Sequence, residues 1–168
     1  MSKIYIREMR LEDWERVAEI YQQGIDSNGA TFVSICPSYQ VWDEAHTKNC
    51  RYVAVIQDEI VGWIVLSPTS TRELYAGVVE VSVYIDNAYQ NCGIGSALME
   101  HMIEASEKEG YWCLYSSIFV ENEGSRHLHE KFGFRLIGYR EKLAKDRYVT
   151  GEILHYMKEE VSSSCRYF

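Results

Sequence analysis

Proline and long hydrophobic runs are scarce in this sequence. Only two of its 168 residues are proline, 46% are hydrophobic and 25% are charged. These proportions exclude a disordered chain, a collagen-like chain and a solenoid, and the length fits one domain with its own core. No apolar stretch is long enough for a membrane span or a signal peptide. We therefore expect a soluble, cytoplasmic protein with one domain at residues 1–160 and a frayed tail at residues 161–168.

Paired cysteines are also missing. The five cysteines are odd in number, widely spaced and never arranged as C-x-x-C. This pattern favours reduced thiols over a disulfide framework or a zinc site. The alternative is a lone catalytic cysteine, but apolar neighbours such as Trp112 and Leu114 favour a buried, inert thiol.

Basic residues are outnumbered by acidic ones. The 17 Lys and Arg residues face 25 Asp and Glu residues, which gives a net charge of −8. A chain with this surplus repels nucleic acid and anionic membrane surfaces, so we expect neither as a partner. A polyphosphorylated ligand would have to be held by a local structure rather than by the overall field.

What the sequence does contain is an alternation of strand and helix patterns. Two apolar segments at residues 51–56 and 60–66 flank a polar turn and predict an antiparallel hairpin. The combination of hairpins with strand–helix–strand units predicts an α+β domain with a mixed sheet. The remaining periodicities predict strands at residues 4–7, 78–85, 114–120, 134–139 and 152–157, and helices at about residues 14–27, 39–48, 94–109 and 125–132.

The segment at residues 78–98 carries the most chemical information. Along its strand, alternate residues from Val79 to Ile85 share one apolar face, and Glu80 lies on the other face. Gly93 and Gly95 then precede a long helix, where free N–H groups and the helix dipole favour a phosphate. A tight turn without a ligand is the alternative. A dinucleotide-binding loop would need a third glycine where Leu98 stands, and a P-loop would need Gly-Lys-Ser/Thr.

Three ordered motifs resemble one enzyme family. Gln90-Asn-Cys-Gly-Ile-Gly-Ser resembles the Q/R-x-x-G-x-G/A motif of the GNAT superfamily of N-acetyltransferases. Residues 79–85 (VEVSVYI) and 119–134 (FVENEGSRHLHEKFGF) resemble the V-E-x-S/T-V-Y-V and N-x-x-S-x-x-L-H-E-x-x-G-F/Y segments of its phosphinothricin and methionine-sulfoximine branch. The resemblance implies the GNAT acyl-CoA N-acyltransferase fold, a central, mostly antiparallel mixed sheet flanked by helices. It also implies acetyl-CoA as co-substrate, no metal, and a homodimer.

The same resemblance implies a cofactor site. In this family the motif strand splays at its end, and its main chain pairs with the pantetheine arm while the glycine loop wraps the pyrophosphate. Many relatives have Lys or Arg before the first glycine, whereas this chain has Asn91 and Cys92. Phosphate binding would therefore rest on main-chain amides and the helix dipole. The cofactor-binding residues implied are Val83, Tyr84, Ile85, Gln90, Asn91, Cys92, Gly93, Ile94, Gly95, Ser96, Asn122 and Ser125.

Acetyl transfer to an amine needs a proton acceptor, and Glu80 is our candidate general base. Partial burial in an apolar strand would raise its pKa towards neutrality, and the family resemblance points to the same glutamate. The alternative is a carboxylate that anchors an arginine or a main-chain amide. His129 stands where most GNAT enzymes have a tyrosine, and it is a candidate to give or take a proton. Its alternative is a structural helix histidine, as we expect for His46, His101 and His155, which are structural or exposed.

The acceptor would be a small amine. Arg72 is a candidate clamp for its carboxylate, and Tyr21, Thr31, Phe32 and Tyr75 are candidates to complete the pocket. A solvated surface arginine is the alternative. We expect an N-acetyltransferase acting on the α-amino group of an amino-acid-like acceptor, by direct attack on the thioester. The alternatives are acetylation of a peptide, protein, polyamine or aminoglycoside amine, and a non-catalytic acyl-CoA-binding regulatory module.

Overall fold

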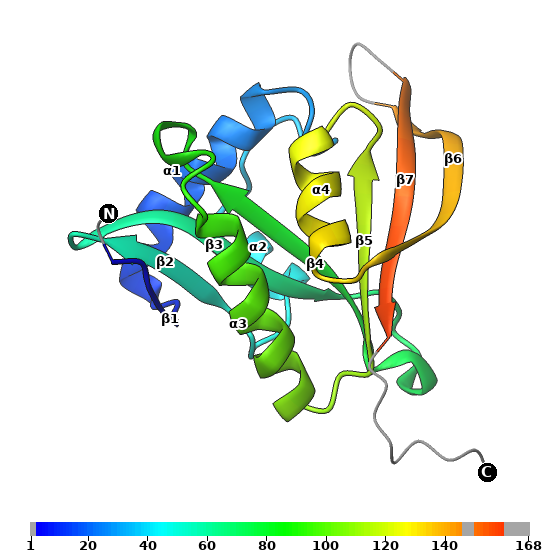
Figure 1. Ribbon diagram of the computed structural model, residues 1–168, viewed down its shortest axis with the longest axis horizontal. Helices are drawn as coiled ribbons and strands as arrows, with labels where there is room; N and C mark the ends of the chain where they lie inside the picture. Colours follow the sequence, from blue (N-terminus) through cyan, green and yellow to red (C-terminus); the bar gives the residue numbers. More distant parts are fainter. Residues whose placement is uncertain (1–2, 146–149, 160–168) are drawn as a thin grey trace.

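The computed structural model describes residues 3–145 and 150–159, and these residues build one mixed sheet with helices on both faces (Figure 1). The strand order is β1-β2-β3-β4-β5-β7-β6. The strands are β1 (Tyr5–Glu8), β2 (Tyr52–Ile56), β3 (Glu59–Pro68), β4 (Val78–Ile85), β5 (Cys113–Phe119), β6 (Arg135–Lys145) and β7 (Thr150–Glu159). The helices are α1 (Trp14–Asp26), α2 (Tyr39–Ala45), α3 (Ile94–Lys108) and α4 (Glu123–Lys131).

Among the described strands, only β4 and β5 pair in parallel, and the other neighbours are antiparallel. Helix α3 connects the parallel pair, as a crossover connection requires. The predicted hairpin is confirmed as β2 and β3, with Gln57 and Asp58 at positive φ in the turn. The expected mixed, mostly antiparallel sheet is therefore confirmed.

Two apolar cores lie on opposite faces of the sheet. On one face, which is nearer the viewer in Figure 1, α3 and α4 cover a core that includes Val79, Val81 and Leu98. On the other face, α1 and α2 cover a smaller core around Trp42 and Trp63. The alternation of β4 explains the division, because Val79, Val81 and Val83 face one core and the even-numbered residues face away from it.

Several predicted boundaries shift in the structure. The prediction that α2 runs to Lys48 is wrong, because His46 has an extended backbone and Thr47 N–H already bonds to the carbonyl of Leu66 on β3. Helix α4 begins at Glu123, because the side chain of Asn122 caps it by accepting from Ser125 N–H. Strands β6 and β7 are longer than predicted because each pairs with the other along most of its length. The predicted tail at residues 161–168 lies outside the described residues.

Candidate active site

The candidate site begins where strands β4 and β5 separate. Their pairing stops after Glu80, which lies opposite Tyr115, whereas β4 goes on pairing with β3 as far as Ile85. Figure 1 shows the two strands meeting at one end and diverging towards the other. Beyond Glu80, the main chain of residues 81–85 therefore makes no ladder with β5, and it is available to an extended ligand.

Glu80 is a half-buried carboxylate at this branch point. Burial raises its pKa above the usual range of a glutamate, and hydrogen bonds from the hydroxyl and main-chain N–H of Ser117 partly offset that rise. Its cross-strand neighbour on β3 is Ser67, which has no charge. The arginine anchor considered for Glu80 is not among these partners, but the main-chain amide is.

A polar cluster on β5 and β7 adjoins Glu80. Tyr115 hydrogen-bonds through its hydroxyl to Nδ1 of His155, and Ser117 Oγ lies 3.3 Å from the Tyr115 hydroxyl. His155 is buried, and Ser117 and Tyr115 share one face of β5. The sequence analysis overlooked this cluster. The available signal was the consecutive run Tyr115, Ser116 and Ser117 in an otherwise apolar strand.

The predicted phosphate loop lies at the N-terminus of α3. Residues 90–93 are exposed, and Gly93 is the N-cap residue with φ of 82°, a conformation that favours glycine. Gly95 allows close packing of the helices, because a Cβ atom there would lie 3.2 Å from Leu128 of α4. The loop thus presents backbone amides to solvent with few side chains in front of them, which fits a pyrophosphate.

A lysine that the sequence analysis did not select lies beside this loop. Nζ of Lys131, at the end of α4, donates to Oγ of Ser96 over 2.8 Å. The loop therefore has a cation close to it, although Asn91 and Cys92 replace the basic residues of the resembling motif. The two residues are 35 positions apart, so only the packing of α4 against α3 reveals the pair.

The other predicted residues of α4 make local contacts. Asn122 caps the helix, and its Nδ2 donates to the carbonyl of Gly29 in the loop after α1. His129 is almost fully buried, and its Nδ1 donates to the carbonyl of Ser125 over 2.7 Å. Nε2 of His129 has no hydrogen-bond partner among the described residues. Burial lowers the pKa of His129, so its neutral form, with a free lone pair on Nε2, prevails at neutral pH.

The predicted acceptor residues fall into two groups. One group is aromatic and adjoins β4 and β5: the ring of Tyr21 lies 5.0 Å from that of Tyr84, and the ring of Phe32 lies 4.5 Å from that of Phe119. Thr31 hydrogen-bonds to both tyrosines of this group.

Arg72 and Tyr75 form the other group, in the loop between β3 and β4. Both side chains are exposed, and the guanidinium lies 5.3 Å from the centre of the Tyr75 ring. Arg72 forms no ion pair with any described residue. Its charge therefore stays available in the loop that leads into the Glu80 strand.

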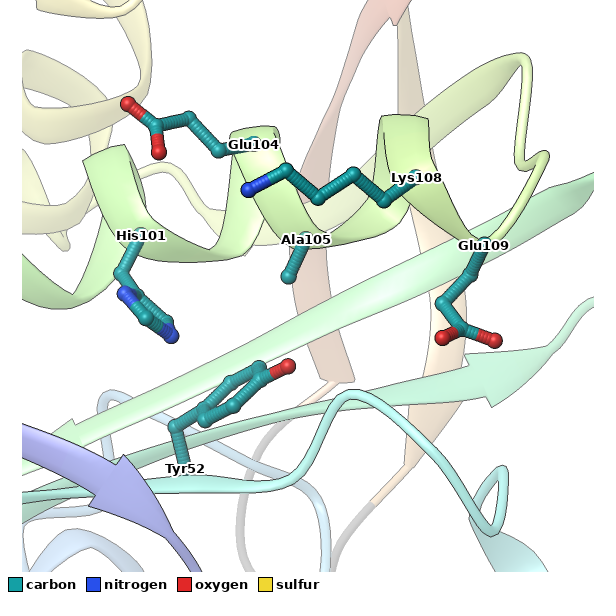
Figure 2. A pocket seen from close by; sticks show the side chains of 6 residues that line it. All are labelled: Tyr52, His101, Glu104, Ala105, Lys108 and Glu109. Carbon is teal, nitrogen blue, oxygen red and sulfur yellow. The ribbon is translucent and has the colours of Figure 1, made fainter.

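A separate surface pocket lies away from these residues. It has a volume of about 140 Å³ and is lined by β2 and α3 (Figure 2). The ring of His101 meets that of Tyr52 there edge to face, at 4.4 Å. None of the predicted site residues lines this pocket. Among the described residues, no group of three or more potential ligands is arranged to hold a metal ion, and no helix is long and apolar enough to cross a membrane.

Comparisons with known proteins agree with this geometry. The model of the acetyltransferase (GNAT) family matches residues 7–134. The chain therefore belongs to the GNAT family and is an acetyltransferase by class. Several of its curated relatives are named phosphinothricin or methionine-sulfoximine acetyltransferases, which is the branch that the motifs indicated.

Two curated relatives illustrate the distance within this branch. The chain is 30% identical over 149 residues to a phosphinothricin N-acetyltransferase of Streptomyces coelicolor. The aligned region covers 83% of this chain and 87% of the relative. The chain is 27% identical over 151 residues to an L-amino acid N-acetyltransferase of Escherichia coli, covering 86% and 90%. Both relatives therefore match the chain over most of its length.

The fold also matches solved structures. An N-acetyltransferase from Staphylococcus aureus superposes with a TM-score of 0.86 at 23% identity, covering 94% of this chain and 99% of the other. A phosphinothricin acetyltransferase from Sinorhizobium meliloti, solved in complex with AcCoA, gives 0.85 at 22% identity, with coverage of 93% and 88%. At these identities the matches establish the GNAT fold.

Proposed function

We propose that this protein transfers the acetyl group of acetyl-CoA to the α-amino group of a small, amino-acid-like acceptor of the phosphinothricin or methionine-sulfoximine type. The position of Glu80 supports the proposal most directly. This half-buried base lies at the point on β4 beyond which the main chain no longer pairs with β5. The names of the curated relatives support the acceptor class.

Acetyl-CoA supplies an activated thioester, and the residues of the candidate site bind it. The main chain of Val83, Tyr84 and Ile85 receives the pantetheine arm as an added strand. The loop at residues 90–96 and the N-terminus of α3 hold the pyrophosphate, and Asn122 and Ser125 complete the cofactor site. A main-chain N–H near Val83 stabilises the oxygen that gains charge during transfer.

Glu80 takes the proton that the acceptor amine must lose, directly or through a water. The raised pKa of its carboxyl group brings it nearer to neutrality, where a general base is most effective. In the neutral form of His129, Nδ1–H is held by the Ser125 carbonyl, so Nε2 accepts a hydrogen bond or proton and has none to give. The aromatic group of Tyr21, Thr31 and Phe32 borders the acceptor, and Arg72, with Tyr75, binds its carboxylate.

The first experiment follows thiol release from acetyl-CoA with a panel of amines. We expect the purified protein to acetylate amino acids, including phosphinothricin and methionine sulfoximine, faster than polyamines, aminoglycosides or peptides. Faster reaction with polyamines or peptides would show that the acceptor belongs to one of those classes and not to the amino acids. No release above background with any amine would leave only a non-catalytic acyl-CoA-binding module.

The second experiment replaces the proposed base. We expect Glu80→Gln to lower kcat by about 10²–10⁴-fold, because an amide of the same shape cannot accept the proton. The Kd of acetyl-CoA, measured by calorimetry, should stay within about threefold, since main-chain groups bind the cofactor. A Glu80→Gln enzyme with unchanged kcat would remove Glu80 from the mechanism.

A further inference from the structure

The cluster beside Glu80 is built by two strands that are distant in sequence. Ser117 on β5 lies directly opposite His155 on β7, and Tyr115 on β5 lies directly opposite Glu80 on β4. Directly opposed residues point to the same face of a sheet, so all four side chains project from one face. This face is opposite the one on which Val79 and Val81 pack against α3.

Hydrogen bonds connect the four side chains in order. Ser117 donates to the Glu80 carboxylate, Ser117 Oγ lies 3.3 Å from the hydroxyl of Tyr115, and that hydroxyl bonds to Nδ1 of His155. Nδ1 of His155 is also 3.5 Å from Ser117 Oγ, and the rings of His155 and Tyr115 stack with centres 5.4 Å apart.

The direction of the donors is set by the nitrogen of His155 that carries the ring proton. Burial, with a smaller effect from Arg140, lowers the pKa of His155 and favours its neutral ring. We assign to this ring the tautomer in which Nε2 carries the proton and Nδ1 accepts the proton of Tyr115. The Tyr115 oxygen then faces Ser117 with free lone pairs. The single proton of Ser117 has two acceptors, the Tyr115 oxygen and Glu80, and a charged carboxylate is the stronger one.

We propose that Tyr115, Ser117 and His155 are positioning residues that keep Glu80 hydrogen-bonded in both of its protonation states. When Glu80 is ionised, Ser117 donates to it. When Glu80 carries a proton, it donates to Ser117 Oγ, and Ser117 turns its own proton to the Tyr115 oxygen, which is free because Tyr115 donates to His155. No bond other than hydrogen bonds changes, and the base is never left as an unpaired buried group.

Other ionisable groups on this face act on the same sites. On β4, Tyr84 interacts electrostatically with Glu80, and on β5 Tyr115 does so as well. On β6, Arg140 acts on both Tyr115 and His155. On β3, the residue opposite Glu80 is the uncharged Ser67. Each of these groups is retained in the variants below, except where it is the residue replaced.

The proposal predicts shifts of opposite sign for two variants. Ser117→Ala removes the donor to ionised Glu80, so the midpoint of Glu80 titration should rise by about one pH unit. His155→Phe keeps a ring stacked on Tyr115 but frees the Tyr115 proton for Ser117 Oγ. Ser117 then has no acceptor other than Glu80, which favours the ionised form, so the midpoint should fall by about half a unit. Tyr115→Phe leaves Nδ1 of His155, 3.5 Å from Ser117 Oγ, as another acceptor, so its midpoint should shift less than that of His155→Phe.

The measurement is the side-chain carboxyl ¹³C shift of Glu80 as a function of pH, together with the pH profile of kcat/KM. Ser116→Ala is the matched control, because Ser116 lies next to Ser117 in β5 but faces the opposite side, and it should leave the midpoint unchanged. Circular dichroism confirms that each variant is folded. If His155→Phe does not fold, His155→Leu, which also removes the Nδ1 acceptor, supplies the second sign.

The proposal rests on Glu80 as the base of the proposed function, and the two can fail separately. An unchanged midpoint in Ser117→Ala, or shifts of the same sign in Ser117→Ala and His155→Phe, would overturn the network. If the ¹³C midpoint shifts as expected but the acidic limb of kcat/KM stays in place, the network stands and Glu80 is not the general base.

Discussion

Burial acts on the two proposed catalytic side chains, Glu80 and His129, in the same sense. It raises the pKa of Glu80 and lowers the pKa of His129, so each is shifted towards its uncharged form. Hydrogen bonds partly counteract burial at both residues, those from Ser117 for Glu80 and that to the Ser125 carbonyl for His129, but burial is the larger effect in each case. The pair therefore provides two proton acceptors at neutral pH.

This arrangement predicts the behaviour of His129 variants. We expect His129→Phe, which keeps a buried ring, to lower kcat by at most about tenfold, the value of one hydrogen-bond acceptor. Because neutral His129 has no proton on Nε2 to donate, kcat of the unmodified protein should not fall between about pH 7 and pH 8.5. A decrease of kcat at alkaline pH that is absent in His129→Phe would show instead that His129 is a proton donor. The check is kcat against pH for both proteins.

At the scale of whole elements, an ion pair between Arg16 and the buried Asp86 positions helix α1 beside the turn that precedes the phosphate loop. Asp86 follows β4 directly, and its carboxylate accepts from Arg16 and Gln23 of α1, at 2.6 Å and 3.0 Å, and from Ala88 N–H. Gln23 in turn accepts from Asn87 N–H. Helix α1 therefore fixes the end of β4 and the turn that leads into the loop.

Removing this pair should weaken both stability and cofactor binding. Burial alone would raise the pKa of Asp86, but Ala88 N–H, Gln23 and Arg16 outweigh it and leave the pKa below its usual value. A lowered carboxyl pKa stabilises the fold above the unfolded pKa and loses that contribution as the pH falls through the folded pKa. We expect Asp86→Asn to reduce the free energy of unfolding by about 1–3 kcal/mol at pH 7, and by less below about pH 4.

Urea unfolding at the two pH values tests this, with KM for acetyl-CoA measured alongside. Glu100→Gln, a change on the exposed face of α3, is the control and should alter neither quantity. An equal loss of stability at both pH values would contradict the role of the charge.

The contact between α3 and α4 leads to a prediction about the cofactor. We expect Lys131→Met to raise the Kd of acetyl-CoA by about tenfold, because it removes the ammonium group that lies 2.8 Å from Ser96 in the loop. Lys108→Met, at the far end of α3, should leave the Kd unchanged. Equal effects of the two variants in calorimetry would mean that general charge, rather than the position of Lys131, matters.

For the whole molecule, the net charge of −8 opposes a polyphosphorylated ligand. Salt screens this repulsion, and it also screens the attraction of Lys131, so the two effects partly cancel. We expect the Kd of acetyl-CoA to change by less than about fivefold between roughly 0.05 M and 0.5 M salt. A steep loss of affinity over this range would show that side-chain cations, rather than main-chain amides, hold the phosphates.

The sequence by itself determined the features that depend on neighbours within one segment. The alternation of β4, the turn between β2 and β3 and the glycines before α3 are local, so periodicity and motif spacing were enough to predict them. The family followed from the same local motifs, because the residues that bind the cofactor lie close together along the chain.

Only the tertiary structure decided which distant side chains meet. His155 reaches Tyr115 across 40 positions and Lys131 reaches Ser96 across 35, because β7 pairs with β5 and α4 packs on α3. Likewise, β6 and β7 exceed their predicted lengths because each supplies the other's hydrogen bonds. Strand pairing and helix packing are long-range choices, and a periodic pattern records which face is buried but not what it is buried against.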